Sequence, residues 1–316
     1  MPSPRTEVDA VVVGGGAAGL AAALWLGRYR RSVLLVDSQE YRSAQVEISH
    51  GYLGRDPQAP GDLLATGREE LLRYPTAKIH VGRVDNVVRR EDDLFAVDLG
   101  SEEVLAHRVV LACGVSDVFP DVGGFREHYG ASLFHCPACD GYEARDGDVI
   151  ALGWSDAVAG FAATLKNWAR SVTVVTDGKR FEGEAGARDS LRAHEIEVIE
   201  EGAQELVGSR GDLTGLRLVS GRLLPATLCF FSIAHVPRND LARALGCDID
   251  DEGYVTVDNC GRTSTPGVYA AGDLTPGLQF VQVAAASGTV AGVTAAQSFF
   301  GERGAPTSPD PAPDVT

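Results

Sequence analysis

The sequence predicts an α/β protein made of two nucleotide-binding domains of the Rossmann type, each with three layers. Three observations support this prediction. The chain has 316 residues, more than one hydrophobic core usually serves. An order of apolar strand, helix and apolar strand occurs near the N-terminus and recurs in the middle of the chain. The first of these units also contains a glycine-rich turn between its strand and its helix.

The first β-α-β unit lies at the start of the chain. Residues 8–13 and 32–36 are short apolar runs typical of buried parallel strands, and the Ala- and Leu-rich residues 17–29 predict the helix between them. The mostly apolar stretch 10–27 is nearly long enough to span a membrane, but the three consecutive glycines within it would break a spanning helix. We therefore expect no membrane partner.

The turn of this unit reads Gly-Gly-Gly-Ala-Ala-Gly and satisfies the Gly-x-Gly-x-x-Gly pattern of dinucleotide sites. Gly14 permits a tight turn, Gly16 lets a pyrophosphate approach the backbone, and Gly19 lets the helix pack closely on the strand. Asp37 lies 21 residues after Gly16, at the end of the next strand, where it can accept hydrogen bonds from a ribose. These residues predict a nucleotide site but do not separate FAD from NAD.

The second unit repeats the order without the glycine pattern. Residues 149–152 and 171–175 predict strands, and residues 157–169 predict the helix between them. Between the two units, residues 104–112 and the turn at Gly114 predict a strand that returns to the first sheet.

The C-terminal part completes the first domain. The segment Tyr269-Ala270-Ala271-Gly272-Asp273 ends another strand, and residues 283–299 predict a long Ala-rich helix. The last sixteen residues contain four prolines and no apolar periodicity, which is typical of a disordered tail. The expected bounds are 1–116 with 246–300 for a discontinuous first domain, 117–245 for the second domain and 301–316 for the tail.

The most specific chemical motif is Cys136-Pro137-Ala138-Cys139-Asp140-Gly141. Two thiols three residues apart at a helix start can close a disulfide ring, and the helix N-terminus lowers the thiol pKa. Asp140 can give and take the proton that thiol–disulfide exchange requires. A zinc site is the alternative, but it usually needs four ligands and the other cysteines are isolated, so we expect a redox pair and no metal.

The net charge of the chain limits the classes of molecule that we expect it to bind. A formal net charge of -16 repels nucleic acid and anionic lipid, so we expect neither as a partner. No secretion signal follows the N-terminal apolar run, and only two of six cysteines are paired in sequence. Both features indicate a reducing cytoplasm with one functional disulfide.

Taken together, GGGAAG, CPACDG and TSTPGVYAAGD resemble the low-molecular-weight thioredoxin reductase family of FAD-dependent disulfide oxidoreductases, from Val8 to about Phe300. The resemblance implies FAD as the cofactor, with its pyrophosphate at the glycine motif and its ribityl chain hydrogen-bonded to Asp273. The family's Ala-Thr-Gly segment is Ala112-Cys113-Gly114 here, with Cys in place of Thr. Its Arg-Gln-Ala segment is Val281-Gln282-Val283 here, at the start of the last helix.

The resemblance thereby implies a full set of cofactor contacts. Gln282 and the backbone of Val283 would lie by the flavin pyrimidine, where a helix N-terminus stabilises the reduced flavin. The cofactor-binding residues that we expect are Gly14, Gly16, Ala17, Ala18, Gly19, Asp37, His50, Val84, Ala112, Gly114, Gly272, Asp273, Gln282 and Val283.

The second nucleotide site departs from the family pattern. Its turn reads Gly153-Trp154-Ser155-Asp156-Ala157-Val158, so Ser155 and Val158 stand where glycines would admit a pyrophosphate. Asp156 adds negative charge where a phosphate would lie. The family's basic cluster is replaced by Thr176-Asp177-Gly178, with only Lys179 and Arg180 downstream, and Val281 replaces an arginine. We expect that NADPH binding is lost, with tolerated variation around a working site as the alternative.

A flavin and a dithiol without NADPH are similar to the arrangement in one subset of the same superfamily. These are the flavin-dependent dithiol oxidases, which close disulfides in natural products such as gliotoxin and holomycin. The segment Ser-His-Gly-Tyr-Leu-Gly-Arg-Asp at residues 49–56 is similar to one in those enzymes. Fungal members tend to carry His after the second cysteine, where this chain has Asp140. His50 could sit near the flavin or be a structural hydrogen-bonding residue.

We therefore expect a homodimeric FAD enzyme that oxidises a small dithiol to its disulfide, with molecular oxygen as the electron acceptor. Cys136 would exchange with substrate, Cys139 would face the flavin, and Asp140 would move the proton. One alternative is a thioredoxin reductase that uses NADPH or another donor such as ferredoxin. Another is a flavin-binding redox sensor without catalysis.

Overall fold

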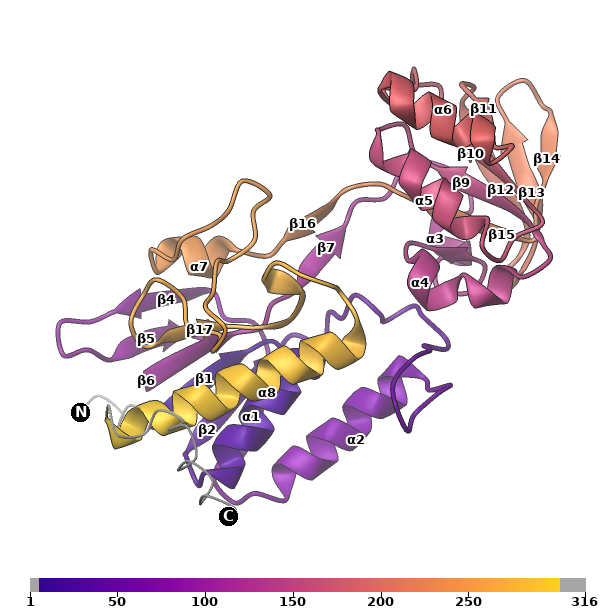
Figure 1. Cartoon of the computed structure of the whole chain (residues 1–316). Helices are drawn as coiled ribbons and strands as arrows, with labels where there is room; N and C mark the ends of the chain where they lie inside the picture. Colours follow the sequence, from indigo (N-terminus) through magenta and orange to yellow (C-terminus); the bar gives the residue numbers. More distant parts are fainter. Residues whose placement is uncertain (1–5, 302–316) are drawn as a thin grey trace, which may run out of the picture. The chain divides into compact units, whose positions relative to one another are not determined.

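The computed structural model describes residues 6–301 and divides them into two compact units (Figure 1). The first unit comprises residues 6–41, 63–115 and 237–301, and the second comprises residues 42–62 and 116–236. The chain passes between them at β7 (Val115–Asp117) and β16 (His235–Pro237), which form a two-stranded sheet. The predicted α/β architecture with a discontinuous first domain is confirmed, and the expected tail lies, from residue 302 on, outside the described residues.

The first unit is built on a seven-stranded sheet of order β3-β2-β1-β6-β5-β4, with β17 paired to β6. The pairs among β1, β2, β3, β6 and β17 are parallel, and β4 and β5 add an antiparallel edge. The strands are β1 (Thr6–Val13), β2 (Val33–Asp37), β3 (Ala77–Val81), β4 (Asn86–Arg89), β5 (Phe95–Asp98), β6 (Glu103–Leu111) and β17 (Val268–Ala270). The helices are α1 (Ala17–Arg28), α2 (Pro60–Leu72, with the part from residue 63 on in this unit), α7 (Asp240–Ala244) and α8 (Val281–Gln297), with the 3-10 turns η2 (Gly272–Leu274) and η3 (Ser298–Phe300).

Helices α1 and α8 lie side by side on one face of this sheet (Figure 1). A Cβ built on Gly288 would meet the carbonyl oxygen of Ala18 at 2.0 Å, and one on Gly292 would meet that of Ala22 at 2.5 Å. Glycine at these two positions is therefore what lets the helix backbones touch. By length and composition alone, residues 281–300 could also cross a membrane, but these glycines pack into the core on α1, as in a core helix of a globular domain.

The second unit has three layers. A parallel sheet of order β11-β10-β9-β15-β8 carries α5 and α6 on one face and the antiparallel sheet β12-β13-β14 on the other (Figure 1). Its strands are β8 (Leu133–Phe134), β9 (Asp148–Leu152), β10 (Ser171–Val175), β11 (Glu197–Ile199), β12 (Ala203–Ser209), β13 (Asp212–Leu218), β14 (Leu223–Pro225) and β15 (Leu228–Phe231). Its helices are α3 (Phe125–His128), α4 (Pro137–Asp140), α5 (Ala157–Leu165) and α6 (Ala185–Ala193), with the 3-10 turn η1 (Tyr142–Ala144).

The unit bounds differ from the expected ones at two places. Residues 237–245, expected in the second domain, belong to the first unit, because Ala242 of α7 is buried in the core on that unit's sheet. Residues 42–62 belong to the second unit, where the Arg210 guanidinium donates hydrogen bonds to the carbonyl oxygens of Gln45 at 2.7 Å and Tyr129 at 3.1 Å. The segment that contains His50 is therefore part of the unit that contains the cysteine pair.

Two predicted helices have different ends in the structure. The helix expected over 157–169 stops at Leu165, because the chain then turns so that the carbonyl of Trp168 accepts a hydrogen bond from the Asp146 amide at 3.0 Å. The helix expected over 283–299 begins two residues earlier, at Val281, and continues from Ser298 as a 3-10 turn.

Candidate functional site

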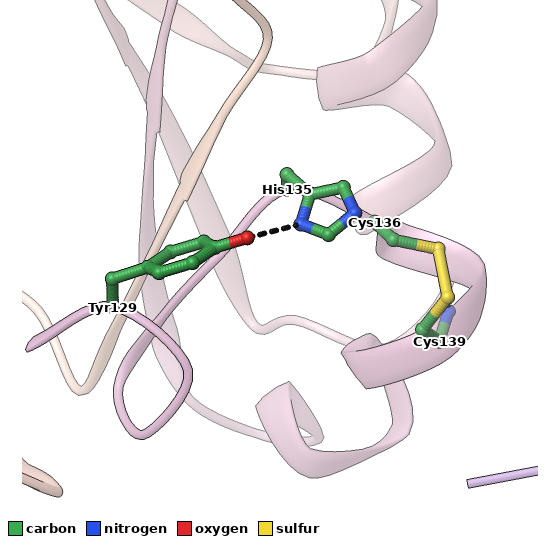
Figure 2. The surroundings of a disulfide bond; sticks show 4 residues. All are labelled: Tyr129, His135, Cys136 and Cys139. Carbon is green, nitrogen blue, oxygen red and sulfur yellow. Dashed lines mark hydrogen bonds between the residues drawn. A yellow bond between two sulfur atoms is a disulfide. The ribbon is translucent and has the colours of Figure 1, made fainter. Parts of the chain in front are cut away.

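The two cysteines of the Cys-x-x-Cys motif form a disulfide at the start of α4 (Figure 2). Cys136 is the N-cap residue of this short helix, Pro137 occupies its first turn, and the two Cα atoms lie 5.3 Å apart. The Cys139 amide donates a hydrogen bond to the Cys136 sulfur at 3.1 Å. An amide donor on this sulfur would stabilise the Cys136 thiolate after the disulfide opens. Both cysteines are partly exposed, so a small thiol can reach them.

Asp140 follows directly and is buried, with 9% of its surface exposed. Burial raises the pKa of its carboxyl group to about 7, the negative charge of Glu143 raises it further, and His50 acts in the opposite direction. A carboxyl group with this pKa holds or releases a proton near neutral pH. The structure thus gives Asp140 the property that the predicted proton-transfer role needs.

His50 lies between two carboxylates of the same unit. Its Nδ1 atom is 3.1 Å from Asp56 Oδ1, and its Nε2 atom is 3.5 Å from Glu143 Oε1. The expectation that His50 binds the cofactor stays a prediction, because the structure places it in the second unit with these carboxylates. Sequence reasoning missed Glu143, although its spacing of three residues from Asp140 was a usable signal.

A second polar chain begins at His135, the residue before Cys136 (Figure 2). The Tyr129 hydroxyl donates to Asp117 Oδ2 at 3.1 Å and lies 3.4 Å from His135 Nδ1, and Arg42 pairs with Asp117 at 2.7 Å. Burial, together with the positive charge of Arg42, lowers the pKa of His135 to about 4. The imidazole of His135 is therefore neutral at pH 7. We assign its proton to Nδ1, because the Tyr129 hydroxyl already donates its hydrogen to Asp117. No local pattern in the sequence predicts these contacts, because Arg42 and Asp117 lie seventy-five residues apart.

The glycine motif of the first unit forms an open turn after β1. A Cβ on Gly19 would meet the carbonyl oxygen of Gly14 at 1.7 Å, and one on Gly14 would meet that of Ala112 at 2.3 Å. A Cβ on Gly16, by contrast, would meet no atom within 4 Å. Gly16 is also the N-cap of α1 and offers no side-chain cap, so the first amides of the helix are available to a phosphate.

Asp37 ends β2 beside this turn and is almost fully buried. It accepts hydrogen bonds from the Gln39 amide at 2.9 Å and from the Tyr41 hydroxyl, and the Arg68 guanidinium lies 3.7 Å away. Burial and the bond to Asp37 raise the pKa of Tyr41 to about 12, so this hydroxyl remains a donor. A buried, oriented carboxylate next to an open glycine turn fits the ribose and pyrophosphate of a dinucleotide such as FAD.

The structure places the other expected cofactor residues of the first unit near this turn. Ala17 and Ala18 begin α1, and a Cβ on Gly272 would meet the Ala18 Cβ at 2.8 Å, which brings η2 with Asp273 to the same place. Ala112 touches Gly14, and Gly114 follows it with a positive φ of 66°. Gln282 and Val283 lie exposed in the first turn of α8, whose Ala284 is next to Gly272. Val84 follows β3, whose end lies beside Asp37, because the Gly82 amide donates to the Asp37 carbonyl at 2.9 Å, and its side chain is half-buried against the core. His50 lies in the other unit.

The corresponding turn of the second unit has side chains at two of the three glycine positions, Ser155 and Val158. A Cβ on Gly153 would meet Val158 Cγ2 at 2.9 Å, and the Val158 side chain is completely buried. The Lys179 ammonium lies 3.0 Å from the centre of the Trp154 ring. This lysine therefore contacts the turn directly. Asp156 accepts a hydrogen bond from the Glu184 amide at 3.1 Å. Trp154, Ser155 and Lys179 also line a cavity of about 500 Å³ at the carboxyl ends of β9, β10 and β15.

Comparisons with known proteins agree with this geometry. Residues 8–288 match the model of the family described as pyridine nucleotide-disulphide oxidoreductase. The chain is similar to the thioredoxin reductase tcpT of Claviceps purpurea, with 31% identity over 95% of this chain and 97% of that protein. It is also similar to the thioredoxin reductase of Mycolicibacterium smegmatis, with 31% identity over 96% of this chain and 100% of that protein. The crystal structure of HlmI superposes with a TM-score of 0.89 at 37% identity, covering 94% of this chain and 95% of that chain.

Proposed function

The chain belongs to the pyridine nucleotide-disulphide oxidoreductase family and is a thioredoxin reductase-like, FAD-dependent disulfide oxidoreductase, and from this we propose that it works as a dithiol oxidase. In this proposal the substrate is a small-molecule dithiol, the product is its disulfide, and molecular oxygen takes the electrons. The overall balance is one dithiol and one oxygen molecule converted to one disulfide and one hydrogen peroxide.

The observation that supports the proposal is the turn after β9, where Ser155 stands at the position at which a glycine would let a pyrophosphate approach the backbone. The buried Val158 side chain stands at the third glycine position, and Lys179 contacts Trp154 of the same turn. Asp156 precedes α5, so an acidic side chain lies where a phosphate would be held by the helix N-terminus. In this proposal the accessible Cys136–Cys139 disulfide, rather than NADPH, is the place where electrons enter.

The exchange at the disulfide uses three residues of the chain. A substrate thiolate attacks Cys136, the bond between the two sulfurs breaks, and Cys139 leaves as a thiolate that takes the proton held by Asp140. The Asp140 carboxylate then removes the proton of the second substrate thiol. That thiolate attacks the substrate sulfur bonded to Cys136, the substrate disulfide forms, and the Cys136 thiolate leaves, stabilised by the Cys139 amide. FAD, when bound, would be held by Gly14, Gly16, Gly19 and Asp37 and would supply the acceptor for the two electrons on their way to oxygen.

Anaerobic reduction tests the proposal. Purified holoenzyme is mixed without oxygen with dithiothreitol in one experiment and with NADPH in another, and the visible absorbance of the flavin is followed. We expect dithiothreitol to bleach the flavin and NADPH to leave it oxidised, and admission of air should restore the colour with formation of hydrogen peroxide. A Cys139→Ser variant should lose the bleaching. Bleaching by NADPH at least as fast as by the dithiol would refute the proposal.

The second candidate function is a thioredoxin reductase, which the names of the tcpT and Mycolicibacterium relatives favour. This reaction runs the same disulfide chemistry in the opposite direction and needs an electron donor. Addition of thioredoxin with NADPH, or with reduced ferredoxin, separates the two functions, because only the reductase consumes the donor. The homodimer and the cytoplasmic location stay predictions, which size-exclusion chromatography and cell fractionation can test.

A further inference from the structure

The buried Asp37 carboxylate, which is expected to accept hydrogen bonds from a ribose, already has two donors on it. The carboxyl group lies against the backbone of the glycine turn, because a Cβ on Gly15 would meet its Cγ atom at 2.1 Å. Oδ1 accepts a hydrogen bond from the Gln39 amide at 2.9 Å, and Oδ2 accepts one from the Tyr41 hydroxyl. The turn therefore fixes where the carboxylate lies, and the residues that follow β2 hold its two oxygens.

Arg68 of α2 adds one further hydrogen bond behind Tyr41. Its Nη1 atom donates to the Tyr41 hydroxyl at 2.8 Å and lies 3.7 Å from Asp37 Oδ2. An arginine can only donate, so the tyrosine oxygen accepts from Arg68 and the tyrosine hydrogen points to the carboxylate. The direction of both bonds, from Arg68 to Tyr41 and from Tyr41 to Asp37, is therefore determined.

Tyr41 and Arg68 are both anchored in the first unit. The Tyr41 ring packs against the hydrophobic core beneath α1 and α2, and the guanidinium carbon of Arg68 lies 5.8 Å from the centre of this ring. Leu64 and Leu71, one turn before and one turn after Arg68, are buried in the same core. The arginine therefore reaches the tyrosine from a helix whose own position is set by apolar packing.

These contacts determine both the charge and the plane of the Asp37 carboxylate. A buried carboxylate needs a cation and hydrogen-bond donors around it, and Arg68 and Tyr41 supply them. The terminal torsion of an aspartate is broad, so hydrogen bonds decide the plane of its carboxyl group. Gln39 and Tyr41 use two of the roughly four acceptor positions of the carboxylate. The other positions are available to a ligand in a fixed direction.

We propose that Tyr41 and Arg68 are positioning residues for FAD, which hold the Asp37 carboxylate charged and in one plane so that it accepts a hydrogen bond from the 2′-hydroxyl of the adenosine ribose. Asp37 is the residue that contacts the cofactor, and Tyr41 and Arg68 act through it. The inference goes beyond the proposed function, because an oxidase and a reductase of this family need FAD equally.

The test measures cofactor binding by holoenzyme without dithiol or NADPH. Holoenzyme is diluted in steps, and the flavin fluorescence of the ultrafiltrate gives the dissociation constant of FAD. The same series is run after exchange for FAD that lacks the 2′-hydroxyl of its adenosine ribose. The variants are Tyr41→Phe, Arg68→Met and Arg68→Lys. Tyr74→Phe is the matched control, because the Tyr74 hydroxyl also accepts a hydrogen bond from an arginine, Arg28 at 3.0 Å, but lies by Gly27, at the end of α1 opposite to the glycine turn.

In the wild type, loss of the 2′-hydroxyl should weaken binding about 10-fold or more, as expected for one hydrogen bond to a charged acceptor. Tyr41→Phe should weaken FAD binding about 10-fold and reduce the cost of the missing hydroxyl to about 3-fold or less, because the two changes remove parts of one interaction. Arg68→Met should act in the same direction. Arg68→Lys keeps the charge and a donor, so it should stay within about 3-fold of the wild type. Tyr74→Phe should match the wild type with both cofactors.

Four outcomes would overturn the positioning role. The first is a Tyr41→Phe variant that binds FAD as the wild type does, and the second is one that loses the same factor with both cofactors. The third is tighter binding of FAD by Tyr41→Phe, which would mean that the hydroxyl occupies the place of the ribose. If Tyr41→Phe does not fold by circular dichroism, the arginine variants decide, and equal FAD binding by Arg68→Met and Arg68→Lys is the fourth. A dithiol that fails to bleach the flavin would refute the oxidase function and leave these binding constants valid.

Discussion

The two β-α-β turns of the molecule share a backbone plan and differ in what fills them. Each turn follows a buried strand and opens a helix, after β1 in the first unit and after β9 in the second. In the first, a Cβ on Gly16 would meet nothing within 4 Å, so the space beside the backbone is open. In the second, the corresponding position is Ser155, and the position of Gly19 is taken by Val158, which is completely buried against Gly153. The first turn therefore has no side chain where a pyrophosphate would approach, and the second turn has a serine there.

The difference shows that the fold and the nucleotide site depend on different residues. The sheet of the second unit is stabilised by strands such as β9 and β10, whose apolar side chains pack against α5 and against the antiparallel sheet. None of that burial requires a bound nucleotide. A few side chains at Gly153–Val158 can therefore close the site while the architecture persists.

In the second unit, two buried ionisable side chains lie next to the disulfide and not at the β-α-β turn. Asp140 and His135 flank the cysteine pair, and burial moves the pKa of each towards its neutral form, to about 7 and about 4. The first unit keeps Asp37 buried next to its open turn. The buried carboxyl group of each unit therefore lies at that unit's candidate site, Asp37 at the glycine turn and Asp140 at the disulfide.

The largest effect that would sharpen this comparison is expected for Gly19→Ala. The added methyl group would meet the Gly14 carbonyl oxygen at 1.7 Å, a backbone collision that no side-chain movement relieves. We expect a cost above about 4 kcal/mol, or roughly a thousandfold in FAD affinity if the whole loss falls on binding. The ratio of flavin to protein absorbance after gel filtration measures it.

The matched control for this change is Gly160→Ala in α5 of the second unit. A Cβ on Gly160 meets no atom within 4 Å, so the same substitution should stabilise that exposed helix position by about 0.5–1 kcal/mol. Normal FAD content in Gly19→Ala would contradict the assignment of the first turn as the cofactor cradle.

The second effect concerns Asp140→Asn and depends on pH. The folded-state pKa of Asp140 is raised above its unfolded value, so the wild type loses stability as the pH rises from about 4 through about 7. The uncharged Asn variant avoids this loss and should be more stable above pH 7, by at most about 4 kcal/mol, with little difference near pH 4. Tm values measured for both proteins across this range test the sign.

Asp189→Asn provides the control, because Asp189 is a highly exposed aspartate of the same unit. It should show no comparable gain in Tm at any pH. A Tm difference between Asp140→Asn and the wild type that stays constant with pH would show that Asp140 is not buried in its charged form at neutral pH.

Much of this comparison could be predicted from the sequence, because it depends on local signals. Continuous apolar runs located β1, β2, β9 and β10, and β10 has the predicted bounds, 171–175. The glycine spacing located the open turn, and the two cysteines form the disulfide that their spacing indicated. In each case the residues that create the feature lie within one strand, helix or turn.

The surroundings of the disulfide could not be predicted in this way. His50 meets Glu143 across ninety-three positions of sequence, and Arg42 meets Asp117 across seventy-five. Such pairs depend on how the segment 42–62 folds back onto the second unit, and that depends on single contacts such as those of Arg210. No periodicity in the sequence indicates such contacts, so the pairing of His50 with Glu143 could not be predicted.

The smallest of the three effects is expected for Val158→Gly, which converts the second turn towards the sequence of the first. Removing this buried side chain from the start of α5 should cost about 2–3 kcal/mol through the cavity that remains and the flexibility of glycine. We expect no gain of NADPH binding, because Asp156 and the Lys179–Trp154 contact stay in place. Thermal unfolding with and without NADPH measures both quantities, since a ligand that binds the folded state raises Tm.

Val158→Ala separates the two contributions to this cost, because it creates most of the cavity and keeps a helix-forming residue. It should lie between the wild type and Val158→Gly in stability, and NADPH should again leave Tm unchanged. A rise in Tm with NADPH in Val158→Gly alone would mean that the valine side chain by itself closes the turn. The same rise in the wild type would mean that the turn binds the nucleotide in spite of its side chains, and the contrast between the two units would then concern sequence alone.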